Sequence, residues 1–424
     1  MPRAEVDSLR PRRHEADHRL VDEVDRNAGV VGGDQAEPRH IGDRPPVRCV
    51  AHNGVGEVVE HTHSLERIEQ LYDVGCRCGI GLCVFTLPSM TGRSNELPRR
   101  ELGSHGLVSS AIGLGTMGMT MAYGDADESG GITAIRRAHE LGVTMIDTAE
   151  LYGMGTGSNE GLVGRAIKDF RDEVLVATKF GYDFTDPSKF DGSLNSKPER
   201  IVQVVENSLG YLGTDYIDVL YQHRVDPAVP IEEVAGTVGE LVEAGKVRFF
   251  GLSEAGPDNI RRAHMVHPVS VLQTEYSIFE RAVEVAVLPV LRELGIGFVA
   301  YSPLGRGLLT DQIKPAAEYP LNDMRRSDER WQPGNYGHNV NAVRKLRDIA
   351  DAKGWTVSQL ALAWLLAQGD DIVPIPGTRR QARVEENVAA AAITLSADEL
   401  RAIDEILPHG AAGARYPAAM LPRW

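Results

Sequence analysis

The sequence predicts one (β/α)8 barrel, the TIM-barrel fold, over residues 97–408, with an extra N-terminal hairpin and a C-terminal helix. Short apolar segments of strand length alternate with longer segments whose apolar residues recur at helical spacing, and eight such strands can be placed in order. An open, doubly wound sheet is the alternative arrangement. No G-x-G-x-x-G sequence opens a helix after the first strand, which disfavours that alternative.

The elements follow from local signals along the chain. Residues 101–107 predict a short hairpin, and the helix at 128–141 ends at Gly142. Pro198 lies near the start of a helix, where its missing amide hydrogen costs nothing, and Ser396 with Glu399 predicts a capped start of the last helix. The predicted strands are 110–116, 143–149, 173–180, 216–223, 247–254, 269–276, 296–302 and 372–376. The predicted helices are 128–141, 159–170, 197–212, 230–244, 258–267, 283–294, 340–352, 357–368, 380–391 and 396–406, with a longer loop over 313–339.

Composition and charge exclude several classes of function. The 424 residues carry a formal net charge of −15, which argues against nucleic-acid binding and against an anionic membrane surface. No apolar run approaches the roughly 20 residues that a transmembrane helix needs. The N-terminus lacks the basic and then apolar pattern of a secretory signal. We therefore expect a cytoplasmic protein.

Residues 1–89 differ in composition from the rest of the chain. They contain no lysine and their apolar residues keep no sustained period, so we expect a disordered extension. A second hypothesis is that this segment is translated from upstream of the gene and that the natural chain starts at Met90. Peptides from before Met90, in protein made from its own gene, would contradict it. Residues 409–424 are expected to form a C-terminal tail.

All the cysteines lie in this first segment. They are Cys49, Cys76, Cys78 and Cys83. With His61 and His63 they suggest a zinc site, but the spacing does not match paired C-x-x-C motifs, so we expect no bound metal. The cysteine-free remainder suits a reducing compartment and excludes a catalytic thiol in the barrel.

Four chemically distinctive side chains follow consecutive predicted strands. Asp147 and Tyr152 follow the second strand, Lys179 ends the third and His223 ends the fourth. Each alone has an ordinary reading, as a turn residue, a packing residue, a solvated charge or a satisfied polar group. Adjacent strands of a barrel bring their carboxyl ends together, so the four are predicted to face one cavity.

These residue types suit the reduction of a carbonyl group. Tyr152 can deliver a proton to the alkoxide that forms, and a free phenol has a pKa near 10. A neighbouring Lys179 ammonium is expected to stabilise the phenolate and lower that pKa. Asp147 can pair with Lys179 and hold it in place. A neutral His223 can donate to the carbonyl oxygen and orient it.

The same motifs resemble the catalytic tetrad of the aldo-keto reductase superfamily. Asp147-Thr148-Ala149-x-x-Tyr152-Gly153, Lys179 in Ala-Thr-Lys-Phe and His223 in Tyr-Gln-His occur in the family's order, and the resemblance extends from about residue 97 to residue 407. It implies an oxidoreductase that reduces an aldehyde or ketone with NADPH, with Tyr152 as general acid. Residues 221–227 and 323–326 resemble the bacterial and plant branch of perakine reductase-like and pyridoxal reductase-like enzymes.

The resemblance also leaves a second function open. Some barrels of the superfamily are NADPH-binding regulatory β-subunits of potassium channels, with slow or no turnover, and they can retain the tetrad. For the enzyme, the expected partner is a small carbonyl substrate, with no nucleic acid or membrane. Met117, Tyr182 and residues 319–339 are expected to line its pocket, where Trp331 and Tyr336 either face the substrate or pack the loop. The substrate itself and the oligomeric state are not predicted.

The resemblance further implies where NADPH binds, extended across the carboxyl end of the barrel. Ser253 and Gln273 match residues that hold the nicotinamide carboxamide, and Tyr301 matches the residue that stacks on the ring. Glu254 stands where many relatives have Asn, and Gly377 where some have Lys. The full implied set is Thr116, Met117, Ser253, Gln273, Tyr301, Ser302, Leu304, Gly305, Gly307, Gly377, Thr378, Arg379, Arg383, Glu386 and Asn387.

For two segments of this set, the residues themselves give a physical reason to expect a bound phosphate. The glycines of residues 302–307 let backbone amides approach a pyrophosphate. Thr378, Arg379 and Arg383 stand at the start of a predicted helix, a position that favours a phosphate, and their charge favours NADPH over NADH. Without a ligand, the first loop is an ordinary glycine- and proline-rich turn, and the arginines are ordinary solvated charges.

Overall fold

The computed structural model describes residues 97–417. The hypotheses on residues 1–89, on a start at Met90 and on the cysteines therefore lie outside the described residues, as do the last residues of the C-terminal tail. Within residues 97–417, the helices are all too short or too polar to cross a lipid bilayer.

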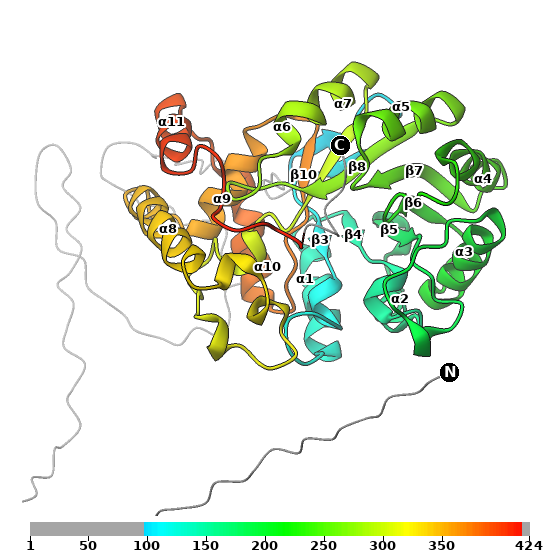
Figure 1. Ribbon diagram of the computed structural model, residues 1–424, viewed down its shortest axis with the longest axis horizontal. Coiled ribbons are helices and arrows are strands. Elements are labelled where there is room, and N and C mark those ends of the chain that lie inside the picture. Colours follow the sequence, from blue (N-terminus) through cyan, green and yellow to red (C-terminus); the bar gives the residue numbers. More distant parts are fainter. Residues whose placement is uncertain (1–96, 418–424) are drawn as a thin grey trace, which may run out of the picture. The chain divides into compact units, whose positions relative to one another are not determined.

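Eight parallel strands form the predicted barrel. They neighbour one another in the order β10-β9-β8-β7-β6-β5-β4-β3, and Figure 1 shows them surrounded by helices. Gly115 bridges Gly377, and the amide of Gly113 donates to the carbonyl oxygen of Pro374 over 2.9 Å, so the first strand meets the last. The strands are β3 (Leu114–Gly115), β4 (Met145–Asp147), β5 (Leu175–Phe180), β6 (Ile217–Gln222), β7 (Val247–Ser253), β8 (Val269–Glu275), β9 (Gly297–Tyr301) and β10 (Ile372–Pro374).

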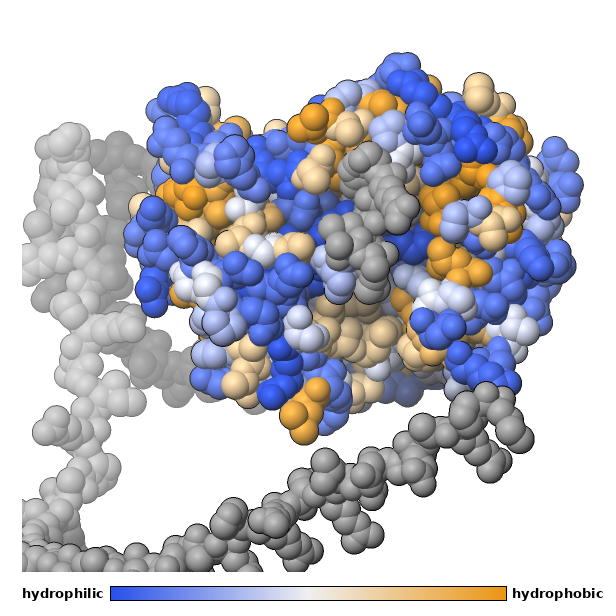
Figure 2. Space-filling view, in the orientation of Figure 1, coloured by the Kyte–Doolittle hydropathy of each residue, from blue (hydrophilic) through white to orange (hydrophobic). Residues whose placement is uncertain are grey.

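The helices cover the outside of the sheet, and the molecular face in Figure 2 is mainly hydrophilic. One predicted helix, at 283–294, is divided into two, because a proline near the start of the second part lacks the amide hydrogen that a continuous helix requires. The capping box of Ser396 and Glu399 is present as predicted. The helices are α1 (Glu128–Glu140), α2 (Ser158–Ile167), α3 (Pro198–Leu212), α4 (Ile231–Glu243), α5 (Pro257–Val266), α6 (Val283–Ala286), α7 (Leu288–Leu294), α8 (Asn335–Asp351), α9 (Val357–Leu366), α10 (Gln381–Ala389) and α11 (Ala397–Ile406).

The long loop after β9 is more ordered than predicted. Short 3-10 turns interrupt it, and α8 begins at Asn335, five residues before the predicted start, after Gly334 with its φ of +92°. The 3-10 turns of the described chain are η1 (Met117–Met119), η2 (Glu150–Gly153), η3 (Arg171–Glu173), η4 (Pro187–Lys189), η5 (Gly305–Gly307), η6 (Ala316–Glu318), η7 (Met324–Arg326), η8 (Glu329–Trp331) and η9 (Ala390–Ala392).

The predicted N-terminal hairpin is confirmed, and it packs against the barrel interior. β1 (Arg99–Glu101) pairs antiparallel with β2 (Val108–Ser110). Leu102 and Leu107, between them, are fully buried in one hydrophobic cluster with inward-facing residues of the strands. Gly103 has a φ of +75°, and a Cβ there would lie 2.2 Å from the carbonyl oxygen of Gly295, so this close contact requires glycine. The strand residues of the cluster are Met145, Ala177, Val219, Tyr221, Val271, Val299 and Val373.

The alternation along each strand places polar side chains beyond this apolar layer. Asp147 follows Met145 by two residues, and Lys179 follows Ala177 in the same way. Side chains two residues apart on a strand point to the same side of the sheet. The barrel interior is therefore apolar where the hairpin packs and polar toward the carboxyl ends of the strands, where the predicted catalytic residues lie.

Candidate active site

Asp147 and Lys179 form a buried ion pair at the carboxyl ends of β4 and β5. Lys179 Nζ lies 2.6 Å from Asp147 Oδ1 and donates to the carbonyl oxygen of Thr148 over 2.8 Å. Both residues are only 1% exposed. Gln273 Nε2 donates to the second carboxylate oxygen, Oδ2, over 2.7 Å. The pair is thus fixed by further hydrogen bonds, which an ion pair removed from water needs.

Tyr152 lies in η2, immediately after β4, and its hydroxyl is 3.3 Å from Lys179 Nζ. The turn that carries it is held from two sides. Thr120 Oγ1 donates to the carbonyl oxygen of Tyr152 over 2.8 Å, and Glu150 forms a buried ion pair with Arg200 of α3. The structure therefore brings the phenol to the ammonium group, as the sequence predicted.

His223 follows β6 and completes the group. Its ring centroid lies 6.0 Å from that of Tyr152 and 5.2 Å from that of Tyr182, with the rings nearly perpendicular in both cases. Burial, with the charges of Lys179 and Arg224, lowers the pKa of His223 well below 6.5. The imidazole is therefore neutral at neutral pH, which is the form expected from the sequence.

The pKa of Tyr152 differs from the expectation. Burial, followed by the Asp147 carboxylate, raises the pKa of Tyr152 well above 10. The predicted lowering of this pKa is therefore wrong for this structure, because burial and the Asp147 carboxylate both disfavour the phenolate. Burial also lowers the pKa of Lys179, against the opposing effect of Asp147. At neutral pH the phenol keeps its proton, which is the state that a proton donor needs.

The residues implied for the nicotinamide end gather beside this group. Ser253 pairs in register with Gln273 across β7 and β8, and Glu275 pairs with Tyr301 across β8 and β9. The contact from Gln273 to Asp147 links them to the Asp147–Lys179 pair. Sequence reasoning did not foresee this contact, because Gln273 and Asp147 belong to strands that are not neighbours in the sheet.

The loop after β9 has an unusual backbone. Ser302 and Arg306 have positive φ angles of +48° and +57°, and Gly305 and Gly307 lie between and after them at +55° and +100°. Such angles are costly for residues with a side chain, and they gather at functional sites. Two glycines in such a backbone allow the close approach of a phosphate group. Leu304 packs against the hydrophobic core beneath the loop.

The basic turn before α10 is present, but Arg379 and Arg383 bind groups of the protein itself. Arg383 forms an ion pair with Glu386, and the amide of Arg380 donates to Thr378 Oγ1 over 3.2 Å. Arg379 donates to the backbone carbonyl oxygens of Gly118, Tyr123 and Asp125, so it holds the loop after β3. Gly377 is at the barrel seam, and Asn387 is 4% exposed.

Two further residues of the implied cofactor set lie just after β3. The hydroxyl of Thr116 is completely buried, where it bonds the carbonyl oxygen of Asp147 over 2.8 Å and Asn159 Oδ1 over 2.7 Å. Its side chain therefore serves the packing beneath the site and is not available to a ligand. Met117 begins η1 and is partly exposed.

The loop residues expected at the substrate pocket divide between two roles. Tyr182 contacts His223 at the site. Trp331 is 2% exposed and packs against Tyr319, with ring centroids 6.4 Å apart, and Tyr336 packs against the same core. Of the two readings for Trp331 and Tyr336, the structure therefore supports packing of the loop.

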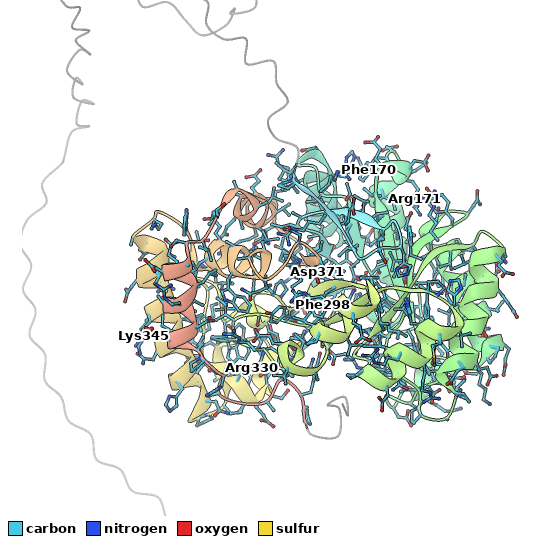
Figure 3. All side chains as sticks on the ribbon, turned by 90° about the horizontal axis from the view of Figure 1, so that it is seen from above. Phe170, Arg171, Phe298, Arg330, Lys345 and Asp371 are labelled. Atoms are coloured by element: carbon cyan, nitrogen blue, oxygen red, sulfur yellow. The ribbon has the colours of Figure 1, made fainter. Side chains whose placement is uncertain are left out.

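One cavity of the described chain is lined by none of these residues. It encloses about 340 Å³ between α8, α11 and the segment after α11, and it is lined by residues such as His338 and Lys345. Figure 3 shows Lys345 at the outer side of the molecule and Phe298, a barrel strand residue, near its middle. The cavity therefore does not belong to the candidate active site.

Sequence reasoning missed the contribution of the C-terminal segment. Arg415 forms two hydrogen bonds with the buried carboxylate of Glu254, of 2.6 and 2.7 Å, and the Tyr416 hydroxyl lies 3.2 Å from that of Tyr301. The guanidinium of Arg224, next to His223, lies 5.9 Å from the Tyr416 ring. The only sequence signal was Glu254 itself, an acid at a buried strand end.

Known proteins resemble this chain in sequence. The sequence model described as the Aldo/keto reductase family matches residues 111–408. The chain is 44% identical to Probable aldo-keto reductase 1 of Glycine max over 322 residues, 74% of this chain and 91% of that protein. It is 42% identical over 328 residues to the aldo-keto reductase yakc [NADP(+)] of Schizosaccharomyces pombe, 76% of this chain and 95% of that protein.

A solved structure shows the same fold. The aldo/keto reductase from Klebsiella pneumoniae in complex with NADP and acetate superposes with a TM-score of 0.59 at 26% identity, covering 76% of this chain and 99% of that one. The fold, the extent of the family match and the two curated relatives agree with one another. This chain therefore belongs to the aldo/keto reductase family.

Proposed function

We propose that the protein is an NADPH-dependent reductase of aldehydes or ketones, with Tyr152 as the general acid. The observation that carries the proposal is the position of Lys179 Nζ, 2.6 Å from Asp147 Oδ1 and 3.3 Å from the Tyr152 hydroxyl, beside a neutral His223. A protonated phenol next to a fixed ammonium group is suited to giving a proton to an alkoxide.

The chain's own residues have distinct tasks in this reaction. When bound, NADPH supplies the hydride that goes to the carbonyl carbon. A neutral His223 donates a hydrogen bond to the carbonyl oxygen and orients it. Tyr152 then transfers its hydroxyl proton to that oxygen, which completes the alcohol. Lys179 stabilises the phenolate that remains, and Asp147 with Gln273 holds Lys179 in place.

Several observations support NADPH as the cofactor. The left-handed φ angles of Ser302 and of residues 305–307 suit the approach of a pyrophosphate, and the basic start of α10 suits a 2′-phosphate. We assign the pyrophosphate to Ser302, Gly305 and Gly307, and the 2′-phosphate to Thr378 and Arg383. Arg379 serves the loop after β3 and Thr116 is buried, so neither side chain is part of this assignment. One relative is named for NADP(+), and one solved neighbour contains NADP.

The test is loss of NADPH absorbance with a panel of carbonyl compounds that includes 4-nitrobenzaldehyde, methylglyoxal and pyridoxal. Tyr152→Phe should abolish turnover, because it removes the proton donor, and should leave NADPH binding unchanged. A general acid contributes about 10²- to 10⁴-fold to a rate. A Tyr152→Phe variant that keeps the full rate would show that the assigned mechanism is wrong. NADPH binding without turnover on any member of the panel would favour the regulatory barrel.

A further inference from the structure

The C-terminal segment lies across the candidate active site. Figure 1 shows the chain after α11 running back toward the middle of the barrel. The amide of Ala411 donates to the carbonyl oxygen of Phe279 over 2.9 Å, and Asn339 binds both the amide and the carbonyl oxygen of Ala412, each over 2.9 Å. The amide of Ala414 donates to Glu329 Oε2 over 3.0 Å. Four successive backbone attachments thus fix the approach of the next residue, Arg415.

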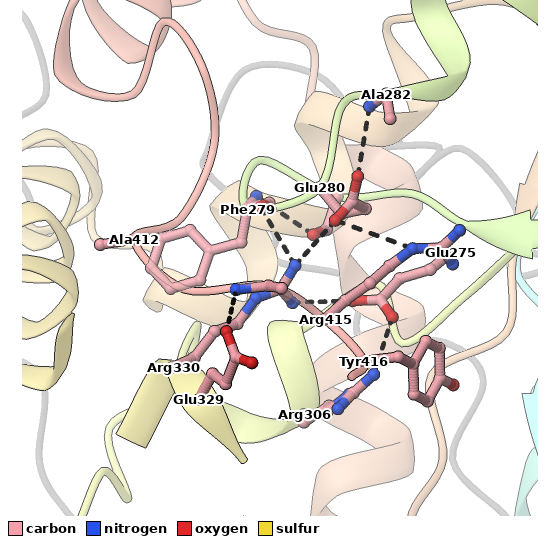
Figure 4. A network of polar contacts seen from close by, with 12 residues as sticks. Glu275, Phe279, Glu280, Ala282, Arg306, Glu329, Arg330, Ala412, Arg415 and Tyr416 are labelled. Carbon is pink, nitrogen blue, oxygen red and sulfur yellow. Dashed lines mark hydrogen bonds and ion pairs between the residues drawn. The ribbon is translucent and has the colours of Figure 1, made fainter. Parts of the chain in front are cut away.

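Arg415 is buried and enters a dense set of charges, part of which Figure 4 shows. Within this set, Arg306 bonds Glu275 and Asp328, and Arg330 bonds Glu275 and Glu280. Among the residues that the structure describes, Arg415 is the cation that contacts Glu254, and it does so through both of its terminal nitrogens. A buried carboxylate requires such compensation, because the loss of its partner costs more than the loss of an exposed ion pair.

Glu254 in turn fixes Tyr301. Its Oε1 atom accepts a hydrogen bond of 2.9 Å from the Tyr301 hydroxyl as well as the 2.6 Å bond from Arg415. Glu254 also has a positive φ of +54°, which is unfavourable for a residue with a side chain and persists only where the surroundings hold the backbone. Arg415 also donates directly to the Tyr301 hydroxyl over 3.3 Å. Arg415, Glu254 and Tyr301 therefore contact one another, and together they link the C-terminal segment to the end of β9.

We propose that Arg415 is a positioning residue, which holds the Tyr301 ring where the nicotinamide binds, both through Glu254 and through its own bond to the Tyr301 hydroxyl. The proposal rests on the proposed function, in which Tyr301 stacks on that ring. The C-terminal segment is then a fixed part of the cofactor site, and the acid at position 254 and the arginine at position 415 are a matched pair. Neither group touches the reacting atoms.

The experiment compares two ligands on each variant. NADPH contains the nicotinamide, whereas 2′-phospho-ADP-ribose has the same phosphates and adenosine without it. Binding of each is measured directly, by the change in protein fluorescence, for Arg415→Met, Glu254→Gln and the double variant. Arg415→Met should weaken NADPH binding about tenfold, because Tyr301 is no longer held against the nicotinamide, and should leave binding of the fragment unchanged. The double variant should recover part of the loss, because no buried charge remains unpaired.

Arg281→Met is the matched control for a merely structural role. Arg281 also ties a C-terminal element to the barrel, through a 2.7 Å ion pair with Asp404 of α11, and it makes no contact with Tyr301. This variant should lower the melting temperature and change neither affinity. The proposal is overturned if Arg415→Met weakens both ligands equally, weakens neither, or behaves as Arg281→Met does. If the unaltered protein binds neither ligand, the proposed function itself fails.

Discussion

Asp147→Asn tests the buried ion pair most directly, because it removes one charge and keeps the shape of the side chain. Lys179 would be left 1% exposed with no carboxylate at 2.6 Å. Breaking a buried pair in this way costs about 3–5 kcal/mol of stability. The expected response is that Lys179, whose pKa burial already lowers, loses its proton and becomes a neutral amine at neutral pH.

The distance between Lys179 and Tyr152 determines the expected effect of this variant on kcat. Two unit charges 3.3 Å apart, the separation of Lys179 Nζ and the Tyr152 oxygen, interact by about 5 kcal/mol at an effective dielectric constant of about 20. If half of that stabilises the phenolate in the transition state, kcat for carbonyl reduction should fall about 10²-fold. The assays are steady-state reduction, NADPH binding and denaturant unfolding.

Two companion variants separate the effects on stability and on rate. Asp147→Asn combined with Lys179→Met should regain stability relative to Asp147→Asn and remain inactive, because no buried charge is left unpaired. Asp218→Asn is the control, since Asp218 is fully buried and pairs with Arg171 outside the tetrad; it should lose stability and keep kcat. The reasoning is refuted if Asp147→Asn keeps kcat within about threefold while NADPH binding is unchanged.

The rate of carbonyl reduction should be independent of pH between about pH 6 and 9, since His223 stays neutral and Tyr152 stays protonated. The rate of alcohol oxidation should instead increase as the pH rises. An inflection in the reduction rate near the ordinary histidine pKa would contradict this prediction. Arg383→Ala should raise the KM for NADPH and leave that for NADH nearly unchanged, and equal effects would exclude a 2′-phosphate contact. Gly103→Ala should lower the free energy of unfolding by about 2 kcal/mol or more relative to Gly106→Ala, as measured by denaturant unfolding. Both glycines have a positive φ, but only at Gly103 would a Cβ meet the Gly295 carbonyl oxygen. Equal losses in the two variants would mean that this contact is unimportant.

The grouping of Asp147, Tyr152, Lys179 and His223 could be predicted from the sequence because it depends on two local regularities. Strand residues two apart face the same side, and the carboxyl ends of successive parallel strands are adjacent. Asp147, Lys179 and His223 are all placed by these rules, since each stands at the end of its own strand. Tyr152 needs only the short turn of η2 in addition. The barrel and its hairpin follow from the same local periods and turn signals.

Other features depend on distances that no local period determines. The contact of Gln273 with Asp147 crosses the barrel between strands that do not neighbour each other. Arg379 reads in the sequence as a phosphate ligand, but the closure of the sheet brings the loop after β3 against it. The pKa of Tyr152 likewise depends on how completely the surrounding loops exclude water, and burial is the largest cause of its rise.

Glu254 shows where a sequence signal is present but cannot be completed. An acid in place of an expected amide at a buried strand end requires a cation, because an unpaired carboxylate there would be strongly destabilising. The sequence offers several arginines for this role after β9, and their spacing does not distinguish them. Arg306 and Arg330 turn out to bond Glu275, which leaves Arg415 to Glu254. The path of the last described residues over the barrel therefore decides which arginine pairs with Glu254.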